Sequence, residues 1–277
     1  MGFELIVPED KDELFTLMAE GDYHLLAGGT DLFVKIEKDM VSPERVIDLT
    51  KVIEGPKLED ESDTVRISAT ATHGDLANSS LIKKEFPLLA ESAEAVGGVQ
   101  LRNMATVGGN ICNASPSADT LIALYALDAR LKLESRDGSR TLPIDEFIRG
   151  PGQTDLNQGE FLKAITIPKL SGEYRHYFNK VGRRNALDIS VCSMGFALRE
   201  TDGRIEDIRI AYGAVAPVIV RPNSVEKYLR GKRPNREVIT EARELLDEEI
   251  TPISDIRGSA DYRRKVALRN LEAIIDN

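Results

Sequence analysis

Two short glycine-rich segments, far apart in the chain, constrain the fold more than any other feature. Residues 27–31 read AGGTD and residues 106–110 read TVGGN. Because glycine has no Cβ atom, its backbone N–H groups can approach a ligand closely and adopt positive φ angles. The first segment lies between a short apolar run and a helical pattern, which directs N–H groups and the helix dipole toward an anion. Either segment alone is typical of a tight turn, but together they predict a split site for a diphosphate.

Other motifs narrow the kind of nucleotide site. Neither segment reads GxGxxG, which disfavours a Rossmann dinucleotide site. A Walker loop ends in Gly-Lys-Ser/Thr, and the chain's Gly231-Lys232-Arg233 lacks both the upstream glycine and the hydroxyl. The two cysteines, Cys112 and Cys192, are too few for the four thiolates of an iron–sulfur cluster, and no CxxC or HExxH spacing is present. We therefore predict no metal site in this chain.

Composition excludes several classes of partner. The 277 residues carry a net charge of −10, which disfavours nucleic acid and anionic lipid as ligands. No run of residues approaches the ~20 apolar positions that a membrane-spanning helix needs, and the amino terminus shows no export signal. Two cysteines also argue against a disulfide-stapled secreted protein. We expect a cytoplasmic protein with no membrane insertion.

Periodicity divides the chain into two units. In the first unit, helices are expected at residues 8–20 (with Pro8 at the first position), from residue 32, from Pro87 and at 118–127. Strands are expected at 24–27, 45–49, 65–71 and 161–167. A hairpin is expected around Asp137-Gly138. Residues 99–120 are expected to be a long functional loop. A boundary is placed near residue 171. Beyond it, three strands (174–181, 190–199, 205–215) and two amphipathic helices (235–249, 260–275) are predicted.

Three segments carry a resemblance to a known family. They are AGGTDLFVKI (27–36), QLRNMATVGGNICNASPSADT (100–120), and Lys180 with RNALDI (184–189). Together they resemble the FAD-binding medium subunit of the molybdenum hydroxylases, the xanthine dehydrogenase and carbon monoxide dehydrogenase family. The resemblance implies an α+β fold. A two-part FAD-binding domain of the vanillyl-alcohol-oxidase-like (PCMH) type would occupy residues 1–170, with parts at about 1–55 and 56–170. A smaller α+β flavoprotein C-terminal domain, a three-stranded antiparallel sheet plus helices, would occupy residues 171–277.

The resemblance also implies the cofactor-binding residues for a non-covalent FAD. Residues of the first loop would surround the diphosphate: Leu25, Leu26, Ala27, Gly28, Gly29, Thr30, Asp31 and Leu32. The second wall would consist of Thr106, Val107, Gly108, Gly109 and Asn110, and Arg102 from the same segment is included. Asp119 would hold a ribose hydroxyl of the adenosine half, and Leu162 would pack by the ring system. Lys180 would lie near the isoalloxazine and tune it, and Val96 aligns with an aromatic contact in eukaryotic relatives.

Simpler roles remain open for several of these residues. From spacing alone, Lys180 can be a surface lysine on a strand, and Asp119 can be a helix N-cap. His24, His73 and His176 are interpreted as ordinary surface or satisfied residues. Cys112 is interpreted as an inert small residue because no basic neighbour is evident, and Cys192 as a core residue. A valine at Gly29 or Gly108 is expected to abolish FAD retention by filling the space of the diphosphate oxygens.

The function that follows is an FAD-binding electron-transfer subunit of an oxidoreductase. The molybdenum cofactor would lie on a large partner subunit and the iron–sulfur clusters on a small one. This chain would take electrons from those clusters and pass them to an external acceptor such as NAD or a quinone. An interface near the ring end of the flavin and a heterotrimer are expected. The alternatives are a self-contained FAD-dependent oxidoreductase with its own small organic substrate, and a non-catalytic protein that has lost the flavin.

Overall fold

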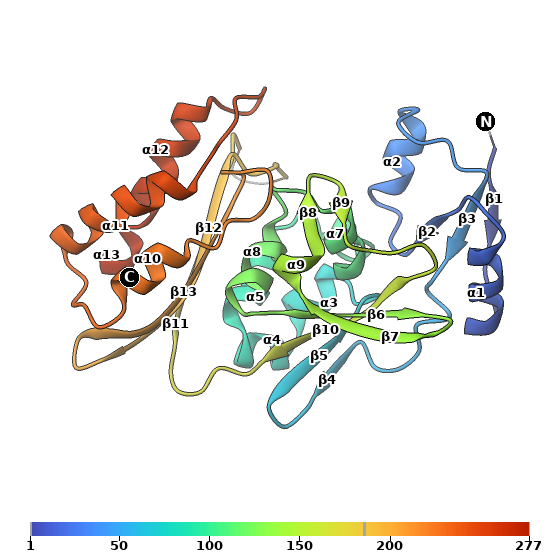
Figure 1. Cartoon of the computed structure of the whole chain (residues 1–277), viewed down its shortest axis with the longest axis horizontal. Helices are drawn as coiled ribbons and strands as arrows, with labels where there is room; N and C mark the ends of the chain where they lie inside the picture. The colour runs from blue at the N-terminus through green and yellow to red at the C-terminus, as the bar shows by residue number, and fades with distance from the viewer. Residues whose placement is uncertain (1, 185–186, 277) are drawn as a thin grey trace.

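The computed structural model describes residues 2–184 and 187–276, and it has the predicted α+β class. Three sheets follow one another along the long axis of the molecule (Figure 1). The first is parallel, with the order β1 (Glu4–Ile6), β3 (Arg45–Asp48), β2 (His24–Leu26), and it carries α1 (Lys11–Ala19) and α2 (Leu32–Glu37). Helix α1 begins later than predicted, because the Asp10 side chain accepts a hydrogen bond from the Glu13 amide and caps it. Pro8 therefore precedes the helix.

The second sheet is antiparallel and forms the centre of the molecule. Its strand order is β4 (Leu58–Asp60), β5 (Thr64–Ser68), β10 (Phe161–Pro168), β6 (Arg130–Ser135), β7 (Gly138–Pro143). Strands β6 and β7 form the predicted hairpin. Around this sheet lie α3 (His73–Asn78), α4 (Ser80–Glu85), α5 (Pro87–Glu94), α6 (Val99–Arg102), α7 (Val107–Asn113), α8 (Asp119–Ala126) and α9 (Ile144–Phe147), and a small ribbon of β8 (Ile148–Gly150) and β9 (Gln153–Thr154).

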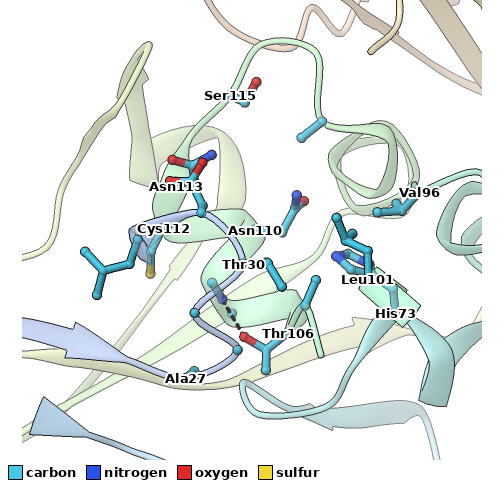
Figure 2. A pocket seen from close by; sticks show the side chains of 18 of the residues that line it. Ala27, Thr30, His73, Val96, Leu101, Thr106, Asn110, Cys112, Asn113 and Ser115 are labelled. Carbon is cyan, nitrogen blue, oxygen red and sulfur yellow. Dashed lines mark hydrogen bonds between the residues drawn. The ribbon is translucent and has the colours of Figure 1, made fainter. Parts of the chain in front are cut away.

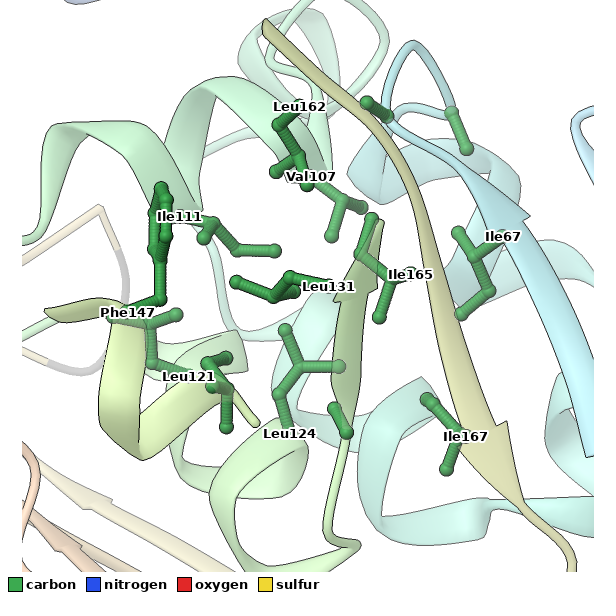
Figure 3. Packing of buried hydrophobic residues seen from close by; sticks show 14 of the residues in the cluster. Ile67, Val107, Ile111, Leu121, Leu124, Leu131, Phe147, Leu162, Ile165 and Ile167 are labelled. Atoms are coloured by element: carbon green, nitrogen blue, oxygen red, sulfur yellow. The ribbon is translucent and has the colours of Figure 1, made fainter. Parts of the chain in front are cut away.

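The prediction of a long loop over residues 99–120 is wrong, because most of this stretch is helical. Helix α7 contains both glycines of the second segment, and Thr106 caps it by accepting a hydrogen bond from the Gly109 amide at 3.1 Å. Val107 and Ile111, four residues apart on one face, are both fully buried in the central core (Figure 3). Burial of these two side chains outweighs the poor helix propensity of the glycines.

The third sheet belongs to the carboxy-terminal unit and confirms the predicted three antiparallel strands. Its order is β11 (Arg175–Val181), β12 (Cys192–Thr201), β13 (Arg204–Gly213), and α10 (Asn223–Leu229), α11 (Arg236–Glu249), α12 (Ala260–Asn270) and α13 (Ala273–Asp276) accompany it. The helix predicted over 260–275 is thus two helices. This unit has its own hydrophobic core, separate from the one that the first two sheets share.

Helix α8 joins the central unit to the third sheet. It packs against β12 and β13 at two strand glycines, where a Cβ atom on Gly195 or Gly213 would come within 3.0 and 3.1 Å of the Ile122 side chain. The missing side chains allow helix and sheet to approach closely. As a result, the start of α8 faces the end of β11, and Asp119 meets Lys180.

Candidate cofactor site

A cavity of about 940 Å³ lies where the parts of the chain that carry the three sheets meet. That volume is at the upper end of the range for small-molecule sites, so it suits a ligand of dinucleotide size. Figure 2 shows Thr30, Thr106 and Asn110 in the middle of the cavity wall, with Cys112 and Asn113 on one side and Val96, Leu101 and His73 on the other. The two glycine segments, 75 residues or more apart in sequence, therefore converge on one space.

The first glycine segment presents backbone donors to this space. Gly29 has φ +69°, in the left-handed region that favours glycine, and α2 begins directly after Asp31. Among the described residues, none accepts a hydrogen bond from the amides of Gly28, Gly29, Thr30 or Asp31. Successive N–H groups without a protein acceptor are the donors that concave anion sites use. The prediction for this segment rested on such donors, and the backbone supplies them.

The second glycine segment differs, because the fold already uses its amides. The Val107 amide donates to the Ala71 carbonyl at 2.8 Å, and the Gly108 amide donates to the Ala69 carbonyl at 2.9 Å. What this segment offers the cavity is side chains. Asn110 accepts a hydrogen bond from the Thr120 hydroxyl at 2.8 Å through Oδ1, which leaves its amide nitrogen directed to the middle of the cavity (Figure 2). The second wall is thus built from side-chain donors and closely packed backbone.

The glycines also have a packing role that sequence alone did not indicate. A Cβ atom on Gly28 would lie 2.1 Å from the Met104 carbonyl oxygen, and one on Gly108 would lie 2.7 Å from Ala69. Cβ atoms essentially never come this close to other atoms, so larger residues at these positions disturb the protein itself. The interpretation that a Gly108 side chain would displace only phosphate oxygens is therefore incomplete.

A buried ion pair closes one part of the cavity wall. Lys180 Nζ lies 2.6 Å from Asp119 Oδ2 and also donates to the Ala95 carbonyl at 2.8 Å. The two side chains are 16% and 8% exposed. Burial raises the pKa of Asp119 to about 6, although Lys180 acts to lower it. Asp119 makes no cap hydrogen bond on α8, so the helix N-cap role considered above is not observed.

Comparison with known proteins identifies the family. The FAD binding domain in molybdopterin dehydrogenase matches residues 1–170, and the CO dehydrogenase flavoprotein C-terminal domain matches residues 176–276. The chain belongs to the FAD-binding medium subunits of the molybdenum hydroxylases.

Individual relatives of this medium subunit agree with the assignment. The glyceraldehyde dehydrogenase medium chain of Sulfolobus acidocaldarius is 35% identical over 241 residues, which cover 87% of this chain and 85% of the relative. The carbon monoxide dehydrogenase medium chain of Hydrogenophaga pseudoflava is 30% identical, covering 96% and 93% of the two chains. A solved structure of carbon monoxide dehydrogenase from that organism, lacking the Mo-pyranopterin moiety, superposes with a TM-score of 0.93 over 99% of this chain and 96% of that one. The chain is thus a flavoprotein component of an oxidoreductase family.

Most residues that the family resemblance placed at the cofactor line the cavity of this medium subunit. They are Leu25 to Leu32, Val96, Thr106, Gly108, Gly109, Asn110, Asp119, Leu162 and Lys180. Two others do not line it. The Val107 side chain is fully buried in the core, and Arg102 donates to the carbonyls of Val96 and Gly97 at 3.1 Å, so it supports the turn that carries Val96. Asn185 and Ala186, within the third segment of the resemblance, lie outside the described residues.

The placement of Asp119 and Lys180 also bears on their expected roles. The resemblance assigned Asp119 to the adenosine half of FAD and Lys180 to the isoalloxazine, at opposite ends of the cofactor. Their contact at 2.6 Å brings the two side chains to one point of the cavity wall. Roles at opposite ends of an extended cofactor do not fit this contact together, and which of the two roles applies stays a prediction.

Lys35 was missed in the sequence analysis, and the interpretation of His73 as an ordinary surface or satisfied residue is wrong. Lys35 Nζ donates to Asn113 Oδ1 at 2.7 Å and pairs with Asp31, which links α2 to the end of α7. His73 is fully buried and lines the cavity, and neither of its ring nitrogens has a hydrogen-bond partner among the described residues. No sequence pattern marks either residue, because their contacts join segments that are distant in the chain.

The unpartnered buried atoms provide a test of whether the cavity suits FAD. Within the described chain, His24 Nδ1, both nitrogens of His73 and Asp119 Oδ1 are buried without hydrogen-bond partners, and all three residues line this cavity. A buried polar atom without a partner costs roughly 1–3 kcal/mol. A ligand rich in hydroxyls, carbonyls and phosphate oxygens would supply partners at these positions, so the residues present fit FAD.

The reactivity of the two cysteines and the capacity of the acidic residues to bind a metal also bear on the chemistry of this chain. Cys112 lines the cavity and Cys192 lies in the third sheet; both are free thiols, and burial raises each pKa to about 12. A thiol with such a pKa is protonated and unreactive near neutral pH. No group of three or more His, Cys, Asp or Glu residues in the described part of the chain could hold a metal ion.

Proposed function

We propose that this chain binds one FAD non-covalently in the cavity and acts as the electron-transfer flavoprotein of a molybdenum hydroxylase complex. The observation that carries the proposal is the row of free amides at Gly28 to Asp31, opposite the Asn110 side chain in a cavity of about 940 Å³. The diphosphate would lie against these donors. The flavin supplies reversible acceptance and release of electrons when bound.

The remaining site residues would have distinct roles. Leu25, Leu26 and Leu32 would flank the nucleotide on the first loop, and Leu162 would pack against a ring. Lys180 would lie near the flavin, and its contact with Asp119 supports a position for Asp119 at that same end. A paired cation beside a flavin tunes its potential less than an isolated one, because the carboxylate offsets its charge. Val107 and Arg102 would act through the backbone and turn that they hold.

Electrons would come from iron–sulfur clusters on a small partner subunit, after oxidation of a substrate at a molybdenum cofactor on a large one. The named relatives are medium chains and subunits, which supports such partners. An apolar rim (defined as Val99, Leu101, Met104, Leu187 and Ile189) has members that are 40–63% exposed, and Leu101, Leu187 and Ile189 of this rim line the cavity. Exposed apolar clusters of this kind mark protein interfaces. We propose that the iron–sulfur subunit docks on the apolar rim and that NAD, a quinone or another carrier is the external acceptor.

We also propose a division into domains at residues 1–170, with parts at about 1–55 and 56–170, and 171–277. The two separate hydrophobic cores and the gap between β10 and β11 support the main boundary. A cytoplasmic location is supported by two free cysteines. No helix in the described residues is long and apolar enough to cross a membrane.

Purification of the full chain tests the proposal directly. We expect a yellow protein with one FAD per chain that acid precipitation releases as free flavin. A colourless protein that does not take up added FAD would refute the flavin assignment, and flavin that stays attached after denaturation would refute non-covalent binding. Turnover of a small organic substrate by the isolated chain would favour the alternative of a self-contained oxidoreductase.

A further inference from the structure

Of the three histidines, all of them within the described residues, His73 alone is fully buried. It begins α3 and its amide donates to the Ala105 carbonyl at 3.0 Å, so the ring is fixed beside the second glycine segment. The imidazole lines the cavity next to Val96 and Leu101 (Figure 2). His176, in contrast, lies on β11 and does not line the cavity.

The hydrogen-bonding state of His73 is the second observation. Its side chain is fully buried, and Nδ1 and Nε2 both lack a partner among the described residues. A neutral imidazole carries one donor and one acceptor, so two hydrogen bonds are unmade. Natural cores seldom retain such groups unless another molecule completes them.

The charge on the ring determines which part of a dinucleotide it suits. Burial, with a smaller effect of the nearby Arg102 guanidinium, lowers the pKa of His73 to about 4. The ring is therefore neutral near pH 7 and is a poor counter-ion for phosphate. Its position also lies to one side of Thr30 and Asn110, which face the proposed diphosphate position (Figure 2).

We propose that His73 is a further FAD-binding residue, which hydrogen-bonds an uncharged polar group of the cofactor, either a ribityl hydroxyl or a flavin carbonyl oxygen. This inference rests on the proposed binding of FAD in the cavity. Leu101, which is 40% exposed and belongs to the four-residue helix α6, stands beside the imidazole. The proposed contact requires the Leu101 side chain to turn away from the ring when the cofactor binds.

If His73 binds the cofactor, replacing it should affect the stability of the apoprotein and the affinity for FAD in opposite ways. In the apoprotein, His73→Leu removes two unpartnered polar atoms and keeps the apolar bulk, so the melting temperature stays equal or rises. FAD binding, in contrast, loses a hydrogen bond and weakens about tenfold, which corresponds to about 1.4 kcal/mol. A histidine with a purely structural role would behave in the reverse way, because its loss would lower the apoprotein melting temperature and leave FAD affinity unchanged.

The experiment measures FAD affinity by calorimetry and melting temperature by circular dichroism, with and without FAD, for the full chain. His176→Leu is the matched control, because it removes a partly buried histidine away from the cavity and should leave FAD affinity unchanged. His73→Gln, which keeps a donor and an acceptor, should retain more affinity than His73→Leu. A folded His73→Leu whose apoprotein is less stable than the wild type, or whose FAD affinity is unchanged, would overturn the proposal.

Two further measurements cover a wild-type chain that binds no FAD and a variant that does not fold. If the wild-type chain binds no FAD, the proposed function fails, independently of His73. If His73→Leu does not fold, the ring ¹⁵N shifts of wild-type His73 are compared with and without FAD. A shift change at one ring nitrogen on adding FAD supports the contact, and unchanged shifts refute it.

Discussion

Removing Lys180 should destabilise the protein in a manner that depends strongly on pH. The pair that Lys180 makes with Asp119 is buried, and the carboxylate already has Oδ1 without a partner among the described residues. In Lys180→Met, Oδ2 loses its cation as well. Breaking a buried pair by removing one partner typically costs about 3–5 kcal/mol, because a charge remains in a poorly solvating site.

The structure gives the sign of the pH dependence. The pKa of Asp119 is about 6 in the folded protein against an ordinary value of 3.8. Because the pKa of Asp119 is higher in the folded protein, the contribution of this carboxyl to the free energy of unfolding is complete below pH 3.8 and is lost as pH rises through 6. At about 1.4 kcal/mol per pKa unit, the wild type loses about 3 kcal/mol of stability over this range.

In Lys180→Met the pKa of Asp119 rises further, because the cation no longer opposes the effect of burial. The carboxyl of the variant therefore continues to lose stability between pH 6 and pH 8, where the wild type no longer changes through this group. We expect the difference between the two proteins to be small at pH 5, where both carboxyls hold their proton, and to approach the full cost of about 3–5 kcal/mol at pH 8.

Urea denaturation of the apoprotein, followed by circular dichroism at pH 5, 6, 7 and 8, measures this difference. Lys84→Met is the matched control, because Lys84 pairs with Glu85 at the surface with a side chain that is 79% exposed. Its urea midpoint should show no pH-dependent change relative to the wild type. The double variant Lys180→Met/Asp119→Leu should recover most of the stability at pH 8. A difference between Lys180→Met and wild type that is constant from pH 5 to pH 8 would refute the reasoning.

Three further changes test other parts of the site. Gly108→Ala should lower stability by about 1–3 kcal/mol in urea denaturation through overpacking, even without FAD, whereas Gly150→Ala, whose Cβ would only meet a flexible side chain at 3.4 Å, should not. Because the pKa of His73 is about 4 in the folded protein, the free energy of unfolding of the wild type should fall by about 3 kcal/mol as pH drops from 6.5 to 4. The fall should be smaller in His73→Leu, and an equal fall contradicts this. Lys35→Met removes the link to Asn113 at 2.7 Å and should speed FAD release roughly fivefold by fluorescence, about 1 kcal/mol; unchanged release contradicts it.

The sequence predicted those elements whose patterns are local. The hairpin of β6 and β7 follows from Asp137-Gly138, and the helix from Pro87 follows from proline at a first helical position. Strands β12 and β13 have the predicted alternation and are joined at the expected turn near Asp202-Gly203. In each case the residues that determine the element lie within it.

Prediction failed where distant residues decide the structure. Helix α7 exists because Val107 and Ile111 fill the central core, and no window around two glycines shows that. The ion pair of Asp119 with Lys180 joins residues 61 apart, and it depends on α8 packing against glycines of the third sheet. Spacing within either segment contains no information about the other, so the separate roles first assigned to these two residues could not be checked against each other.

The two glycine pairs show why a motif can locate a site and still misstate its chemistry. Both were expected to donate amides to a diphosphate, but within the described part of the chain only the first pair has free amides, because Gly108 and Gly109 lie inside a helix anchored to Ala69 and Ala71. Gly108 is small chiefly so that α7 can pack against the backbone after β5, and this packing brings Asn110 to the cavity. Substitutions in the two segments should therefore differ in kind. Changes in the first segment alter ligand affinity through the backbone donors, whereas changes at Gly108 act on the fold first and on the ligand only as a consequence.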